Sequence, residues 1–133
     1  MVMAWVDADS YDDQDGAVLN RSKTRAWCVE GERDHQGEAF ARYDDFEITR
    51  DGRYRLEIEA TAFETDSIAA RLTRKRGPEV EKREVATRDA NGARDAEEWR
   101  LFAVSAPLSA GRVSVAVELR PGVRIRRLRF VPI

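Results

Sequence analysis

The fold of this chain is decided by one stretch of sequence, Asp51-Gly52-Arg53-Tyr54-Arg55-Leu56-Glu57-Ile58-Glu59-Ala60-Thr61-Ala62. After the first two residues, charged or polar side chains alternate with apolar ones at every second position. Successive side chains of a β-strand point to opposite faces, so Tyr54, Leu56 and Ile58 would share one face. The stretch therefore predicts one strand of a half-buried antiparallel sheet.

The pair Asp51-Gly52 at the start of this stretch predicts a hairpin turn. Both residues tolerate positive φ at low cost, which tight hairpin turns require. The turn would join a strand over Ala39–Ile48 to the strand that follows. We expect these two strands to be neighbours.

Similar strand patterns recur along the chain, separated by turn residues. Arg112–Leu119 alternates as regularly as the opening stretch. The polar segment Glu79–Thr87 predicts an edge strand, because charged side chains on an edge discourage pairing with other chains.

The last strand changes parity in its middle. Val123 and Ile125 would face one side, whereas Leu128 and Phe130 fall on the opposite parity. One extra residue in a strand restores a common face, so Arg126-Arg127 predicts a β-bulge.

Many short strands without sustained 3.6-residue periodicity predict an all-β fold, an antiparallel two-sheet β-sandwich or jelly roll. At 133 residues the chain has the size of one domain. We therefore expect a single β-sandwich domain over residues 1–133.

The composition argues against several functional classes. The chain has 23 Lys and Arg against 25 Asp and Glu, a formal charge of -2, so no overall field favours nucleic acid or an anionic membrane. The single cysteine, Cys28, cannot form an intramolecular disulfide, and no Cys and His cluster has metal-ligand spacing. The apolar segment Met1–Val6 is too short for a signal peptide or a membrane span, and the compartment stays open.

The order of these features resembles the carbohydrate-binding modules of families six and thirty-five, which have a galactose-binding-like jelly roll. The resemblance spans nearly the whole chain, although the motifs are degenerate here. It rests on an acidic-alanine strand, an aromatic strand, the opening hairpin, a Trp-centred strand and the closing strand, at Val6–Tyr11, Tyr43–Ile48, Gly52–Leu56, Trp99 and Ala110–Phe130.

The resemblance implies a non-catalytic module that holds sugar in a loop-lined cleft at the edge of the sandwich. Aromatic rings there would stack on the apolar face of a pyranose while polar side chains bind its hydroxyls. The candidate ligand-binding residues are Trp27, Tyr43, Trp99 and Arg126. Trp99 and Tyr43 have the alternative of filling the core, where Trp5 is also expected. The asparagine usual in the family's terminal strand is missing, so the cleft would be a modified one.

The resemblance also implies a structural calcium, held by carboxylates of the first strand and an aspartate near the C-terminus. Asp7 and Asp9 occupy the first-strand positions, but the last strand carries Arg126, Arg127 and Arg129 in place of an aspartate. Calcium prefers about six to eight oxygen ligands. We therefore expect no cofactor, with Asp7 and Asp9 as the only candidate calcium ligands and a solvated acidic turn as the alternative.

The arginines near the C-terminus have two interpretations. Clustered guanidinium groups bind carboxylates or sulfates bidentately and would suit an acidic glycan. Cross-strand pairing with Glu57, Glu59 and Glu118 would neutralise them instead. The balanced net charge favours pairing.

No catalytic constellation stands out. Cys28 and His35 are the only sequence-local nucleophile and base, with nothing to set their geometry. The 25 acids are too many for any pair to be diagnostic of glycoside hydrolysis. We predict a carbohydrate-binding module, with an acidic glycan as one candidate ligand. A structural or protein-interaction sandwich without a sugar site is the alternative, and neither nucleic acid nor membrane is an expected partner.

Overall fold

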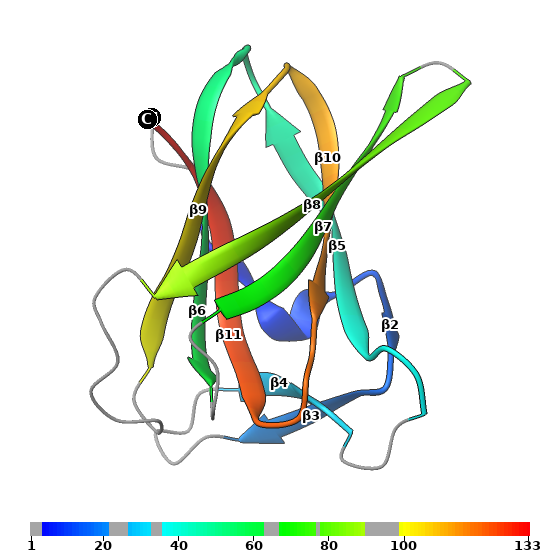
Figure 1. The fold of residues 1–133 in the computed structure, drawn as a ribbon, viewed down its shortest axis with the longest axis vertical. Helices are drawn as coiled ribbons and strands as arrows, with labels where there is room; N and C mark the ends of the chain where they lie inside the picture. Colours follow the sequence, from blue (N-terminus) through cyan, green and yellow to red (C-terminus); the bar gives the residue numbers. More distant parts are fainter. Residues whose placement is uncertain (1–3, 22–26, 33–35, 63–66, 77, 90–98) are drawn as a thin grey trace.

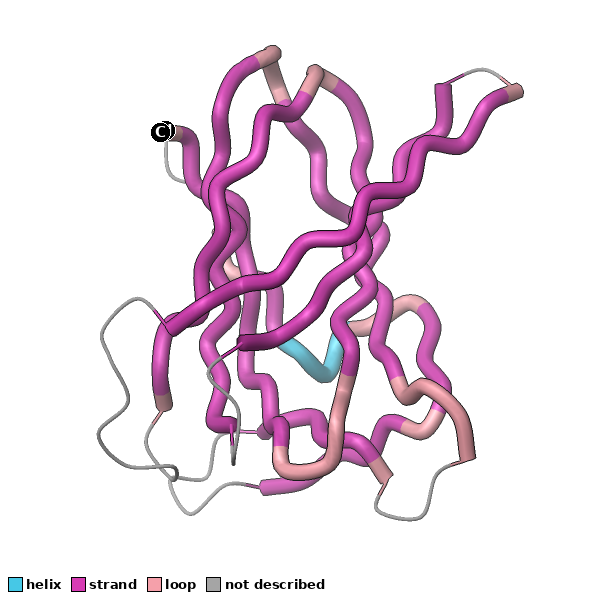
Figure 2. Tube along the Cα trace, viewed as in Figure 1, coloured by secondary structure: helices cyan, strands magenta, loops and turns pink. Residues whose placement is uncertain are grey.

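The computed structural model describes residues 4–21, 27–32, 36–62, 67–76, 78–89 and 99–133. Almost all of this part of the chain is strand, with one short 3₁₀ helix (Figure 2). No helix of the described residues is long and apolar enough to cross a membrane. The elements are β1 (Val6–Asp7), η1 (Ala8–Ser10), β2 (Asp13–Asp15), β3 (Ala17–Arg21), β4 (Trp27–Gly31), β5 (Phe40–Ile48), β6 (Gly52–Ala62), β7 (Ser67–Arg76), β8 (Glu79–Asp89), β9 (Arg100–Leu108), β10 (Gly111–Glu118) and β11 (Val123–Pro132).

The strands form two layers of antiparallel sheet. One layer has the order β2-β5-β10-β7-β8 and the other β9-β6-β11-β4-β3, with β1 paired to β11. The layers meet where the end of β8 reaches β9, through the pairs Arg88↔Ala103 and Asp89↔Phe102 (Figure 1). The prediction of an all-β, antiparallel jelly-roll sandwich is confirmed.

The predicted hairpin at Asp51-Gly52 is wrong. β5 pairs with β2 and β10, whereas β6 pairs with β9 and β11, so the chain crosses from one layer to the other at this turn. The Asp51 Oδ1 accepts a hydrogen bond of 2.8 Å from the backbone N–H of Ala110, in the β9–β10 crossing. Figure 1 shows both crossings at the top of the molecule. Turn residues mark a reversal of the chain, but the layer that the next strand joins depends on distant partners.

The predicted bulge in β11 is confirmed. Ile125 pairs with Ala60 and Arg127 pairs with Glu59, so Arg126 is the extra residue opposite β6. Ile125 and Leu128 both point into the core as a result. On its other side β11 pairs with β4 before the bulge and with β1 after it.

The predicted edge strand is also confirmed. β8 pairs with β7 along Ser67–Arg76, and within the described chain its other side has no partner strand before Arg88. The side chains of Glu79–Glu84 are exposed. The outer ends of β7 and β8 extend away from the two layers (Figure 1).

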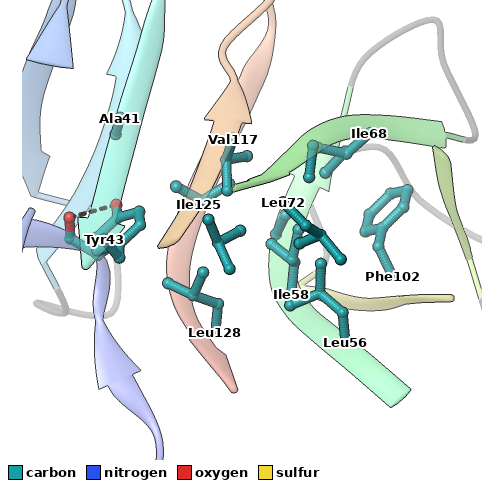
Figure 3. Packing of buried hydrophobic residues seen from close by; sticks show 14 of the residues in the cluster. Ala41, Tyr43, Leu56, Ile58, Ile68, Leu72, Phe102, Val117, Ile125 and Leu128 are labelled. Carbon is teal, nitrogen blue, oxygen red and sulfur yellow. Dashed lines mark hydrogen bonds between the residues drawn. The ribbon is translucent and has the colours of Figure 1, made fainter. Parts of the chain in front are cut away.

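The core lies between the layers and takes alternate residues from both. Figure 3 shows Val117 and Leu72 of one layer packed in the same cluster as Ile125, Leu128 and Leu56 of the other. Burying a side chain of this size stabilises the fold by about 1.5–3 kcal/mol. The apolar side chains at alternate positions of β6, such as Leu56 and Ile58, therefore hold this strand in place.

Candidate functional site

Tyr43 belongs to the core and not to a ligand surface. Only 1% of its surface is exposed, and it lies among the buried residues of the core (Figure 3). Its hydroxyl donates a hydrogen bond of 2.6 Å to the carbonyl oxygen of Ala8 in η1. Burial, reinforced by the Asp9 carboxylate, raises the pKa of Tyr43 far above its ordinary value. The ring therefore fastens η1 to β5, and its placement among the ligand-binding residues is corrected.

Trp99 and Arg126 come together at the start of β9. The Arg126 guanidinium lies 4.5 Å from the centre of the Trp99 ring, and it also binds the Glu59 carboxylate. Trp99 is half-buried and lies outside the core cluster. The backbone of Trp27 begins β4, but its side chain lies outside the described part of the structure.

Trp5 is not a core residue either. Its ring is half-buried and contacts two guanidinium groups, those of Arg127 at 4.3 Å and Arg129 at 4.0 Å from its centre. Cation–π contacts of this kind stabilise by about 0.5–1 kcal/mol at exposed sites. Trp5 therefore covers the outer face of β11.

The arginines near the C-terminus are mostly paired, as the balanced net charge suggested. Arg126 and Arg127 share the Glu59 carboxylate, and Arg129 donates to Glu57 at 2.8 Å. Two further pairs follow the same pattern, Arg120 with Glu118 and Arg124 with Glu30. Because two guanidinium groups share the single Glu59 carboxylate, the charge of Arg126 is compensated only in part.

The residues expected to hold calcium do not fit this ion. Asp7 and Asp9 are exposed, and Asp7 lies opposite Arg127 in the register of β1 and β11. Within the described chain, no three carboxylate, His or Cys side chains stand close enough to hold a metal ion. Two carboxylates beside a strand rich in arginine fall well short of the ligand set that calcium prefers.

The nucleophile and base pair also finds no support. Cys28 is fully buried, and burial raises the pKa of its thiol, only partly opposed by Arg124. His35 lies outside the described residues. A buried thiol of raised pKa is a poor nucleophile.

A groove of about 810 Å³ runs over the outer face of the layer made by β5, β10, β7 and β8. We call it the β10 groove. Small residues of the two central strands line it, Ser114 and Ala116 on β10 and Ala69 and Thr73 on β7. Ser114 lies opposite Thr73 in the register. The absence of bulk at these four positions keeps the middle of the sheet open.

Larger side chains of β5 form one wall of the β10 groove. Phe40 is half-buried, and Arg42 and Asp44 follow it on the same face. Arg42 Nε donates to Asp44 Oδ1 at 2.9 Å. Burial acts to raise the pKa of Asp44, but hydrogen bonds from Arg42 and Ser114 outweigh it and lower the pKa below its ordinary value of 3.8.

The opposite wall comes from β7 and β8. Arg71 and Glu84 are cross-strand partners and form an ion pair of 2.7 Å at the groove surface. The β10 groove thus places one aromatic ring among several charged hydrogen-bonding groups. The apolar face of a sugar ring can stack on such a ring while its hydroxyls bind the charged groups.

The β10 groove was not predicted from the sequence. The outward residues of β10 can be read from its alternation, but their neighbours come from β5 and β7, which lie about 70 and 45 residues earlier in the chain. The spacing of Phe40 and Arg42, two residues apart, was the available signal. It indicates a shared face without saying what lies beside it.

No protein-family model and no curated protein sequence matches the chain. Solved structures do. The C-terminal CBM6 of LamC from Zobellia galactanivorans has a TM-score of 0.68 at 16% identity, over 96% of this chain and 98% of that one. The carbohydrate-binding module CBM6cm-2 of lichenase 5A from Cellvibrio mixtus has a TM-score of 0.68 at 16% identity, over 100% and 99% of the two chains.

A module of the second family is similar to the same extent. CBM35 from Paenibacillus barcinonensis has a TM-score of 0.67 at 7% identity, over 98% of this chain and 100% of that one. At such low identities the likeness establishes the fold. The chain has the galactose-binding-like jelly roll that the carbohydrate-binding modules of families six and thirty-five share.

Proposed function

We propose that this protein is a non-catalytic carbohydrate-binding module and that the β10 groove holds the glycan. The observation that carries the proposal is the half-buried ring of Phe40 beside a row of small residues, with Arg42 and Arg71 on the two sides. The groove is within the size range of small-molecule sites, about 300–1,000 Å³.

The fold supports the same class of ligand. The Cellvibrio mixtus module, which shares this fold along its whole length, is described in complex with cellotriose. That ligand belongs to the other protein. For this chain it makes neutral β-glucan oligosaccharides the first compounds to test.

A binding role fits the groove better than a catalytic one. Glycoside hydrolysis needs a carboxylic acid that is still protonated near neutral pH, with a raised pKa. The pKa of Asp44 is lowered instead, and Glu84 is paired with Arg71. Both carboxylates are thus placed to accept hydrogen bonds from sugar hydroxyls.

We propose a second, smaller contact surface at the start of β9, where Arg126 stacks on Trp99. Trp27 stays a proposed member of this surface on sequence grounds. A planar guanidinium on an indole makes a flat, rigid platform whose rim can contact a sugar. The stacked pair and the β10 groove are separate, since they lie on different layers of the sandwich.

The test is calorimetric titration with a panel of neutral and acidic oligosaccharides. Ala116→Trp fills the floor of the β10 groove and Phe40→Ala removes its ring, so each should weaken glycan binding about tenfold or more. Ser105→Trp, at an exposed position of β9 on the other layer, is the matched control and should bind as the parent does. Circular dichroism confirms that each variant is folded.

Two outcomes would overturn parts of this proposal. If no glycan binds at millimolar concentration, the protein is a structural or protein-interaction sandwich instead. If glycan binds and Ala116→Trp has no effect while Trp99→Ala abolishes binding, the site lies at the start of β9 and not in the groove.

A further inference from the structure

The β10 groove is electrically polarised along its length. Lys75, Lys82 and Arg112 line one end, whereas Glu38 and Glu118 line the other, beside Phe40. The strand register separates the two ends. Toward the cationic end Ser114 pairs with Thr73, which in turn pairs with Lys82, and at the acidic end Glu118 pairs with Phe40. Arg112 and Glu118 are six residues apart on β10, which corresponds to about 20 Å.

The cations that line the β10 groove outnumber its carboxylates, and the excess lies at this end. Lys75, Lys82 and Arg112 are exposed, and none of them forms an ion pair within the described chain. This distinguishes them from Arg42 and Arg71 in the middle of the groove, which have carboxylate partners.

The acids around the cationic end do not neutralise it. Asp44 attracts Arg112 electrostatically, but its carboxylate is hydrogen-bonded to Arg42, and one carboxylate cannot neutralise both guanidinium groups. Glu47 lies opposite Arg112 in the register and lies outside the groove lining. Glu81 does not line the β10 groove but a neighbouring pocket, which shares Thr73, Arg74 and Lys82 with it. Arg74 adds a fourth positive charge and donates to the carbonyl oxygen of Ala110 at 2.8 Å.

We propose that this end of the β10 groove binds an anionic substituent of a glycan, a carboxylate or a sulfate. The inference rests on the proposed function, and it adds the class of glycan and its direction. At the other end Glu38 repels an anion, whereas Glu118 is paired with Arg120. A sugar ring therefore stacks near Phe40 while the charged group lies toward Lys75 and Lys82.

The test compares three ligands with one backbone: a xylo-oligosaccharide bearing glucuronate, the same compound after carboxyl reduction, and a sulfated neutral xylo-oligosaccharide. The anionic forms should bind about tenfold more tightly than the reduced form at low salt, and the difference should shrink as salt rises. The sulfated and glucuronate arms show which anion the site accepts.

The variants separate a local site from general attraction. The double variant Lys75→Gln/Lys82→Gln and the single variant Arg112→Gln should remove most of the preference for the anionic form and leave binding of the reduced form unchanged. Arg53→Gln removes another exposed arginine, at the start of β6 on the other layer, and should keep the preference.

The possible failures are distinguishable. If the reduced oligosaccharide binds and the anionic forms bind no more tightly, the anionic site is wrong and the carbohydrate-binding function stands. If Arg53→Gln lowers the preference as much as Arg112→Gln does, the attraction is diffuse and the site is wrong. If none of the three ligands binds, the proposed function itself fails.

Discussion

Glu57 is an outward-facing residue of β6 that is buried, with only 1% of its surface exposed. Two arginines cover it: Arg55 Nη2 lies 2.6 Å from one carboxylate oxygen and Arg129 Nε lies 2.8 Å from the other. The Arg129 guanidinium in turn stacks on Trp5. Ion pairs covered by an indole ring thus shield this outer face from solvent. The alternation of polar and apolar residues in the sequence would instead predict a solvent-exposed face.

Replacement of Glu57 by glutamine should therefore destabilise the protein. The variant keeps the size of the side chain but removes the charge that Arg55 and Arg129 share, so we expect a loss of about 1–3 kcal/mol in the free energy of unfolding. Urea unfolding followed by circular dichroism measures it. Glu47→Gln, at an exposed position of β5, is the control and should change stability by less than about 0.5 kcal/mol. Equal losses in the two variants would contradict this role of Glu57.

For single residues, the sequence predicted the pairing of charged side chains better than the burial of aromatic ones. The pairing of Arg126, Arg127 and Arg129 with glutamates follows from strand parity and net charge, and the structure confirms it. The depth of an aromatic ring depends instead on what packs over it. Tyr43 is buried because η1 lies against it, whereas Trp5 is only half-buried because it lies on the outer face of the sandwich, against the arginine side chains of β11.

At the scale of elements, alternation predicted the strands and the β11 bulge, because both are written locally in the order of polar and apolar residues. It failed for the connection at Asp51-Gly52, because β5 and β6 have their partners far away in the sequence. A close contact between two elements is equally hard to predict, because the residues that meet are far apart in the sequence. Gly31, at the end of β4, lies against the backbone of Leu119, which follows β10.

Gly31→Ala should destabilise the fold through this contact. A Cβ atom at this position would overlap the carbonyl oxygen of Leu119 and lie 3.2 Å from its carbonyl carbon, and backbone cannot move aside as a flexible side chain can. We expect a loss of about 1–3 kcal/mol by thermal or urea unfolding.

Gly52→Ala is the matched control for Gly31→Ala. A Cβ atom on Gly52 would meet nothing closer than the Tyr54 ring, at 3.8 Å, and Gly52 is not among the glycines with positive φ. Its stability should change by less than about 1 kcal/mol. A tolerated Gly31→Ala, or a Gly52→Ala that is equally harmful, would show that these local contacts are wrongly described.

At the scale of the whole molecule, polar contacts outside the core also join the two layers. Asp89 at the end of β8 and Arg100 at the start of β9 form an ion pair of 3.0 Å, with side chains 4% and 6% exposed. Farther along the same boundary, Arg83 donates to the carbonyl oxygen of Pro107 at 2.9 Å. These contacts close the sandwich where the strands themselves diverge.

The candidate site could be predicted from the sequence only in part. The fold class could be inferred from the order of strands, which resembles a known family. The β10 groove could not, because Phe40, Ser114 and Arg71 become neighbours only when three distant strands pair. Of the residues first chosen for the site, Trp99 and Arg126 do lie together, whereas Tyr43 is in the core.

The continuity of the core predicts that residues 1–133 unfold as one domain. Buried residues from both layers form a single cluster, so neither layer can open without exposing apolar surface of the other. The fluorescence of Trp5 and Trp99 reports on the layer of β11 and β9, whereas far-UV circular dichroism reports on both layers. The two signals should follow one thermal transition, and the calorimetric and van't Hoff enthalpies should agree. Separate transitions would show that the layer of β5 and β10, with its groove, folds independently of the rest.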